Sequence, residues 1–139
     1  LYFNLTIIYM GNSLSKKLLV KDIMTSPVVT VLFSDPVISA VNKMITHDIG
    51  AVVVISGGMP AGMITERDVL RKVILEGLDP RKTICQDIMT TPLVTVEADT
   101  PIEKAFVLMK EKDIRRLPVV RGGRLIGIIT EKDIIRKVL

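Results

Sequence analysis

The length and composition of the chain exclude several classes of protein. Its 139 residues can form one compact domain or two small units. A composition of 48% apolar and 24% charged residues excludes a disordered chain. One cysteine and one histidine exclude an internal disulfide and a Cys/His metal cluster. The net charge of +4 comes from scattered basic residues, which disfavours a nucleic-acid-binding surface.

The opening segment, residues 1–13, is left unassigned. Its first ten residues, LYFNLTIIYM, are apolar but too few to span a membrane, and they lack the basic leader of a secretory signal. Met10 is a candidate for the natural start of the chain. We therefore expect no membrane association, and the single cysteine favours a reducing, cytoplasmic setting.

The rest of the chain consists of two copies of one sequence. A shift of 65 residues, from 22 to 87, aligns DIMTSPVVTV with DIMTTPLVTV, and the same shift aligns GMITERDVLRKVI with GIITEKDIIRKVL without an insertion. Such a period indicates a repeated supersecondary unit. We place the first repeat at 14–76, a linker at 77–83 and the second repeat at 84–139.

Each repeat begins with a predicted strand and a predicted helix. Short β-branched runs follow a proline in both copies and favour strands at 28–31 and 93–96. A helix start comes next, because an Asp-Pro or Thr-Pro pair combines an N-cap residue with a proline in the first turn. Apolar residues then recur at helical spacing. These helix starts are Asp35-Pro36 and Thr100-Pro101.

Each repeat continues with a predicted hairpin and a second helix. Gly-Gly turns separate apolar runs, which indicates two-stranded hairpins. The second helices are expected to begin at Thr65 and Thr130. The predicted fold class is mixed α/β (α+β), with two β-α-β-β-α repeats packed sheet to sheet around a pseudo-two-fold axis. The hairpin strands are 51–55, 61–64, 117–120 and 124–129.

A Thr-x-x-Asp segment stands at the start of each second helix, and two interpretations are open. Thr65 with Asp68, and Thr130 with Asp133, match the reciprocal capping box that satisfies free backbone N–H groups. The alternative is a nucleoside phosphate site, in which the carboxylate accepts the ribose hydroxyls and the helix N-terminus meets the phosphate. The glycine three residues before each threonine would then leave the backbone bare for a flat ring.

Together these motifs resemble the cystathionine-β-synthase (CBS)-type domain, and the pair resembles the tandem called a Bateman module. The resemblance is carried by both Asp-Ile-Met-Thr runs, DIRRLPVV, GMITERD and GIITEKD, and it spans about Val20 to Leu139. It implies a stand-alone regulatory module rather than an enzyme, without a cofactor or a metal. The implied ligand is AMP, ADP or ATP, or S-adenosylmethionine, bound in two clefts between the repeats.

The resemblance assigns eight residues to each cleft, with the Thr-x-x-Asp segment of one repeat opposite two strand starts of the other. The first cleft is expected to bind phosphate more tightly, because it carries two arginines where the second has Gly50 and Ala51. The alternative is that the arginines begin a solvated strand. The first set is Thr65, Arg67, Asp68, Thr90, Val94, Ile114, Arg115 and Arg116. The second set is Thr130, Lys132, Asp133, Thr25, Val29, Ile49, Gly50 and Ala51.

The resemblance also implies a homodimer that acts on an unknown effector protein. Three other functions stay open: a ligand-free interaction scaffold, an enzyme acting on nucleotides, and nucleic-acid binding. The scaffold predicts no response to nucleotides, the enzyme lacks a nucleophile with a matching base, and nucleic-acid binding rests on net charge alone. The candidate dimer residues are Met44, Ile45, Leu70, Ile74, Phe106, Met109, Ile135 and Leu139.

Overall fold

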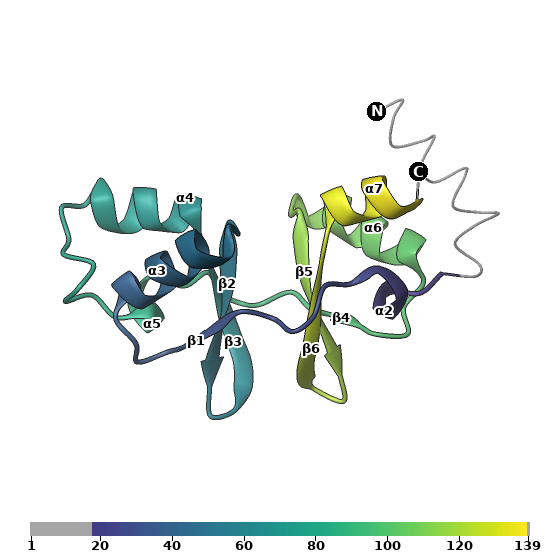
Figure 1. Ribbon diagram of the computed structural model, residues 1–139, viewed down its shortest axis with the longest axis horizontal. Helices are drawn as coiled ribbons and strands as arrows, with labels where there is room; N and C mark the ends of the chain where they lie inside the picture. The colour runs from purple at the N-terminus through teal and green to yellow at the C-terminus, as the bar shows by residue number, and fades with distance from the viewer. Residues whose placement is uncertain (1–17, 139) are drawn as a thin grey trace. The chain divides into compact units, whose positions relative to one another are not determined.

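The computed structural model describes residues 18–138, which form two compact units (Figure 1). The first unit is Val28–Leu93, and the second unit combines the described residues 18–27 with residues 94–138. The unassigned segment 1–13 lies outside the described residues. Within residues 18–138 no helix is long and apolar enough to cross a membrane.

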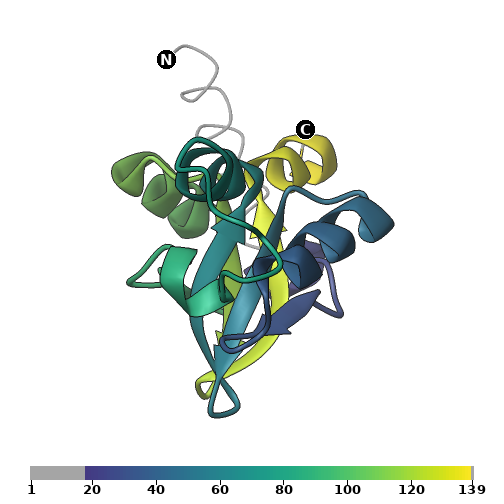
Figure 2. The same ribbon diagram turned by 90° about the vertical axis from the view of Figure 1, so that its left-hand side faces the viewer.

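The first unit is a three-stranded sheet with helices on one face (Figure 1, Figure 2). The strand order is β1-β2-β3, with β1 parallel to β2 and β2 antiparallel to β3. A parallel pair needs a crossover, and α3 supplies it. The elements are β1 (Thr30–Leu32), α3 (Val37–His47), β2 (Ala51–Ser56), β3 (Met59–Thr65), α4 (Glu66–Val69), the π-helical turn η1 (Leu70–Ile74) and α5 (Cys85–Ile88).

The second unit repeats this arrangement. Its strand order is β4-β5-β6, again with one parallel and one antiparallel pair. The predicted β-α-β-β-α order and the mixed α and β class are therefore confirmed in both copies. The elements are α2 (Val20–Ile23), β4 (Val96–Glu97), α6 (Ile102–Lys112), β5 (Arg116–Arg121), β6 (Arg124–Thr130) and α7 (Glu131–Val138).

Two local predictions about the first strand and helix differ from the structure. β1 and β4 begin later than the predicted runs 28–31 and 93–96. The predicted N-cap Asp35 does not cap α3, because its carboxylate accepts a hydrogen bond from the N–H of Leu32 (2.8 Å) in the preceding turn. Pro36 takes the N-cap position without a side-chain hydrogen bond.

A short helical turn precedes the first strand of each repeat, and the sequence analysis did not predict it. The segment after this turn pairs with the hairpin of the other repeat. In the second unit Thr25 exchanges backbone hydrogen bonds of 2.8 and 3.0 Å with Ile128. In the first unit Thr90 exchanges bonds of 2.8 and 3.2 Å with Met63. Each compact unit therefore contains a segment from both repeats.

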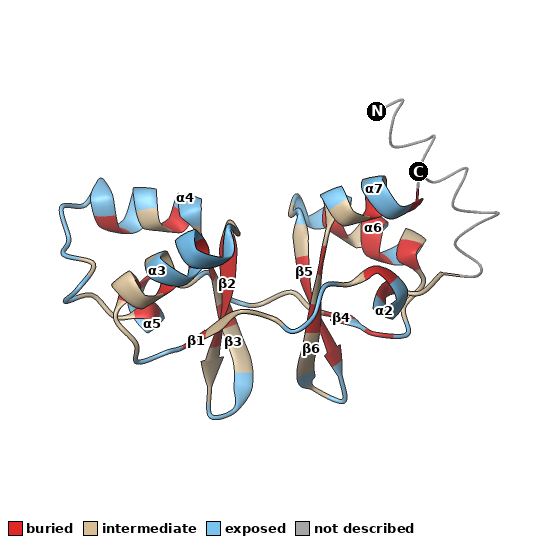
Figure 3. Ribbon diagram, viewed as in Figure 1, coloured by how far each residue is buried: buried red, intermediate tan, exposed pale blue. Residues whose placement is uncertain are grey.

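Each unit has its own hydrophobic core between its sheet and its helices (Figure 3). Three of the candidate dimer residues belong to these cores, because Met44, Phe106 and Met109 are at most 6% exposed. That part of the dimer prediction is wrong, and Leu139 lies outside the described residues. Cys85 is also buried, and its burial, followed by the charge of Asp35, raises the pKa of the thiol to about 11.

Candidate functional site

The first Thr-x-x-Asp segment joins the end of β3 to the start of α4. Thr65 has extended backbone angles, and its hydroxyl accepts a hydrogen bond from the N–H of Asp68 (3.1 Å). The Asp68 carboxylate accepts one in return from the N–H of Thr65 (2.9 Å). The capping box is therefore confirmed. The N–H of Glu66 donates to the carbonyl of Gly50 (3.0 Å), which ties the helix start to the start of β2.

The second segment forms the same junction between β6 and α7. The N–H of Asp133 donates to the Thr130 hydroxyl (3.1 Å), and the N–H of Thr130 donates to the Asp133 carboxylate (3.3 Å). The N–H of Glu131 donates to the carbonyl of Arg115 (2.9 Å). Both repeats thus place a threonine hydroxyl and a carboxylate at the start of a helix.

The two carboxylates differ in their other contacts. The Asp68 side chain is 12% exposed and forms an ion pair with the ammonium of Lys72 (3.1 Å). It also accepts hydrogen bonds from the hydroxyls of Thr65 (3.1 Å) and Thr90 (3.1 Å). Asp133 is half-buried, and its carboxylate is contacted by the N–H of Thr130.

A pocket with a volume of about 550 Å³ lies beside Asp68 within the first unit. Three cationic and two acidic side chains line it, and the net positive charge can attract an anionic group. Sequence reasoning missed Arg71 and Lys72 as site residues. The i,i+4 spacing of Asp68 and Lys72 was the available signal. The lining residues are Thr65, Arg67, Asp68, Arg71, Lys72 and Glu76.

Each predicted set of eight residues is divided between the two units. Of the first set, the structure brings Thr65, Asp68 and Thr90 into hydrogen-bond contact, with the exposed Arg67 beside them. The first unit also contains Val29, Ile49, Gly50 and Ala51. The second unit contains Thr25, Val94, Ile114, Arg115, Arg116, Thr130, Lys132 and Asp133.

The two predicted arginines stand at the start of β5. Arg116 is the antiparallel partner of Thr130, just as Ala51 is the partner of Thr65. Directly opposed residues of a sheet place their side chains on the same face. Arg116 is therefore a neighbour of the second Thr-x-x-Asp segment, while its contact with a ligand at Thr65 stays a prediction. Arg115 is exposed and Arg116 is half-buried.

The glycine before each Thr-x-x-Asp segment has a different role from the predicted one. A Cβ atom at Gly62 would lie 2.8 Å from Met89 Sδ and 2.9 Å from the Thr90 carbonyl oxygen. At Gly127 it would lie 2.4 Å from Met24 Sδ. The bare backbone accommodates the neighbouring protein segment, so the predicted access of a flat ring at these glycines is wrong.

A family model for the CBS domain matches residues 20–75 and 85–139, which is most of the chain. The chain belongs to the CBS domain family. It is 47% identical over 96 residues to an uncharacterised protein of Methanopyrus kandleri, a match that covers 68% of this chain and 49% of the relative. It is 40% identical over 110 residues to a mitochondrial CBS domain-containing protein of Arabidopsis thaliana, covering 76% of this chain and 53% of that one. The chain thus spans about half the length of these two relatives.

Solved structures of CBS-domain proteins share the fold. The CBS domain pair of protein MJ0100, in complex with 5′-methylthioadenosine and S-adenosylmethionine, matches with a TM-score of 0.76 and 30% identity over 86% of this chain and 94% of that one. A hexameric CBS-CP12 protein from bloom-forming cyanobacteria matches with a TM-score of 0.79 and 35% identity over 86% of this chain and 67% of that one.

Proposed function

We propose that this CBS-domain chain is a regulatory module, not an enzyme, that binds an adenosine-containing ligand at its Thr-x-x-Asp segments. The observation that carries the proposal is the arrangement at each helix start, where a threonine hydroxyl and a carboxylate lie at the end of the hairpin's second strand. A related domain pair binds two adenosine derivatives. The candidate ligands are AMP, ADP, ATP and S-adenosylmethionine, and the proposed location is the cytoplasm.

In the proposed complex the carboxylate binds the ribose and the basic side chains bind phosphate. Ribose hydroxyls are donors, and an ionised carboxylate is an acceptor with about four lone-pair sites. Hydrogen bonds to a charged group are worth about 1.5–3 kcal/mol each. Arg67 and Arg71 line the pocket beside Asp68, and guanidinium groups suit phosphate oxygens. Binding of this kind needs no nucleophile and no metal.

Equilibrium binding of a ligand panel tests the proposal. We expect calorimetry to show saturable binding of at least one of adenosine, AMP, ADP, ATP and S-adenosylmethionine. The alternative function is a ligand-free assembly scaffold, which the complete capping boxes would also support, because capping alone explains both Thr-x-x-Asp segments. That alternative requires that no member of the panel binds or changes the melting temperature.

The arginines of β5 provide a test of phosphate recognition. Replacing Arg115 and Arg116 together by alanine is expected to lower AMP affinity by about tenfold or more, because charge-assisted hydrogen bonds are about twice as strong as neutral ones. Adenosine affinity should change little, since adenosine carries no phosphate. Calorimetric titration with both ligands makes the comparison. An equal loss for both ligands, or no loss, means that the arginines contact solvent rather than phosphate.

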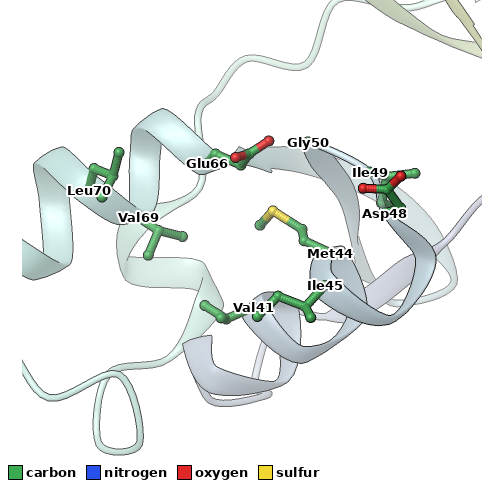
Figure 4. A pocket seen from close by; sticks show the side chains of 9 residues that line it. All are labelled: Val41, Met44, Ile45, Asp48, Ile49, Gly50, Glu66, Val69 and Leu70. Carbon is green, nitrogen blue, oxygen red and sulfur yellow. The ribbon is translucent and has the colours of Figure 1, made fainter.

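We further propose that the module forms a homodimer through the helix face of the first unit. α3 and α4 border an open groove of about 500 Å³ (Figure 4). Ile45 is 74% exposed and Leu70 is 58% exposed, although both are large apolar side chains. Exposed apolar patches of this kind mark interaction sites. The lining residues are Val41, Met44, Ile45, Asp48, Ile49, Gly50, Glu66, Val69 and Leu70.

The second unit shows the same helix face with a charged side chain in place of Ile45. Lys110 stands at the equivalent position, 65 residues on, and its ammonium lies 2.8 Å from the Glu131 carboxylate and 5.2 Å from the ring centroid of Phe106. The face of the first unit has the isoleucine instead. A second copy is the proposed occupant, because a two-fold axis would pack the exposed apolar side chains of this groove, Ile45 and Leu70, against the same side chains of the other copy.

Ile45→Lys is expected to raise the dimer dissociation constant by at least about tenfold, because full burial of an isoleucine contributes about 1.5–3 kcal/mol. The substitution copies the arrangement around Lys110, so the fold should tolerate it. Analytical ultracentrifugation gives the dissociation constant. Leu32→Lys is the control, since Leu32 is 55% exposed away from the groove. A monomeric parent protein at micromolar concentration would contradict the proposal.

A further inference from the structure

The Asp68 carboxylate has its hydrogen-bonding capacity fully used within the first unit. Its Oδ2 atom accepts from the N–H of Thr65 (2.9 Å) and from the Thr65 hydroxyl (3.1 Å). Its Oδ1 atom accepts from the Thr90 hydroxyl (3.1 Å) and from the ammonium of Lys72 (3.1 Å). Four donors match the roughly four acceptor sites of an ionised carboxylate. No site is left for the two hydroxyls of a ribose.

The Asp133 carboxylate keeps most of its capacity. Among residues 18–138, the donor that contacts it is the N–H of Thr130, at 3.3 Å. α7 has a lysine at the same spacing, Lys137, but its ammonium donates to the carbonyl of Ile23 (3.1 Å) and is not within ion-pair distance of Asp133. Asp133 can therefore accept both ribose hydroxyls without losing an existing contact.

Lys72 has the same backbone anchor as Lys137 but reaches the carboxylate as well. Its ammonium donates to the carbonyl of Ile88 (2.9 Å) in addition to its ion pair with Asp68. Lys72 lies in the π-helical turn η1, whereas Lys137 lies in the regular helix α7. The two repeats therefore use one lysine position in two ways.

A ribose can bind Asp68 only when Lys72 and Thr90 release it. A neutral nucleoside offers Lys72 no anion in exchange, so the ammonium would lose its counterion. A phosphorylated nucleoside offers phosphate oxygens in the same pocket, beside Arg67 and Arg71. We propose that Lys72 makes the Asp68 site selective for phosphorylated nucleosides, whereas the Asp133 site also accepts neutral nucleosides. This inference rests on the proposed function and assigns a ligand class to each site.

The test measures the affinity ratio of AMP to adenosine at each site separately. Asp133→Asn leaves the Asp68 site for study, and Lys72→Met is then introduced. In Lys72→Met we expect the AMP-to-adenosine affinity ratio at the Asp68 site to fall by at least about tenfold, because adenosine binds more tightly and AMP more weakly. A tenfold change corresponds to the loss of about one charge-assisted hydrogen bond. Lys72→Arg keeps the cation and should keep the preference for AMP.

Lys137→Met in an Asp68→Asn background is the matched control. The AMP-to-adenosine affinity ratio at the Asp133 site should change by less than about threefold, because Lys137 makes no ion pair with the Asp133 carboxylate. An unchanged ratio after Lys72→Met, or equal changes at both sites, overturns the role of Lys72. If no member of the five-ligand panel binds either site, the proposed function itself is wrong.

A measurement without ligand checks the contact on which the inference depends. The ¹⁵N resonance of the Lys72 ammonium, assigned by its loss in Lys72→Met, should shift in Asp68→Asn and stay unchanged in Asp133→Asn. It should also shift when AMP is added to the parent protein. A resonance that does not respond to Asp68→Asn shows that the ammonium and the carboxylate are not paired, which overturns the proposal whatever the ligand affinities are.

Discussion

Asp133→Ala is expected to weaken binding of adenosine at the second Thr-x-x-Asp site by about tenfold to several hundredfold. The variant removes the acceptor of the ribose hydroxyls, and each charged hydrogen bond contributes about 1.5–3 kcal/mol. The fold should survive, because the lost capping bond costs about 1 kcal/mol. Calorimetry measures the affinity, and urea unfolding followed by circular dichroism measures the stability.

Asp68→Ala is the companion variant, and it should reduce stability more than Asp133→Ala. Its carboxylate is 12% exposed, and its loss leaves the Thr90 hydroxyl without its acceptor and the Lys72 ammonium without its counterion. We expect the free energy of unfolding to fall by about 2 kcal/mol. The loss is not larger because Lys72 is 43% exposed and its ammonium can be solvated. If both variants bind nucleotides as well as the parent does, capping is the whole role of the two carboxylates.

Gly62→Ala is expected to lower the free energy of unfolding by about 2–3 kcal/mol, since overpacking a tight contact typically costs about 1–3 kcal/mol. The added methyl group would lie 2.9 Å from the Thr90 carbonyl oxygen. That oxygen cannot move freely, because it accepts the backbone hydrogen bond from Met63. Urea unfolding provides the measurement.

Gly127→Ala is the matched control for Gly62→Ala. Its closest contact is Met24 Sδ at 2.4 Å, and the end of a methionine side chain can rotate away. The Thr25 carbonyl oxygen is farther off, at 3.2 Å. Gly127→Ala should therefore cost about 1 kcal/mol, at the lower end of the overpacking range. Equal losses at the two glycines would show that the backbone carbonyl does not limit the fit.

The sequence by itself determined the repeat, the order of the main elements and the start of the second helix in each repeat. These features depend on local patterns: Gly-Gly turns predict hairpins, apolar spacing predicts the helices, and Thr-x-x-Asp predicts the capping boxes at Thr65 and Thr130. Such patterns involve residues that are close in the chain, so they can be recognised without a structure. The CBS family resemblance rests on the same local motifs, and the family model confirms it.

Only the tertiary structure decided which distant residues meet at each carboxylate. Thr90 comes from the other repeat, 22 residues after Asp68, and no local pattern places its hydroxyl at 3.1 Å from that carboxylate. The role of Gly62 also depended on a distant segment, since Met89 and Thr90 fill the space that the glycine leaves. Lys72 and Lys137 occupy equivalent sequence positions, yet only Lys72 lies within ion-pair distance of its carboxylate among the described residues. Two similar repeats therefore give different sites, because a side chain's hydrogen-bond partner depends on geometry over a few ångströms that the sequence pattern does not specify.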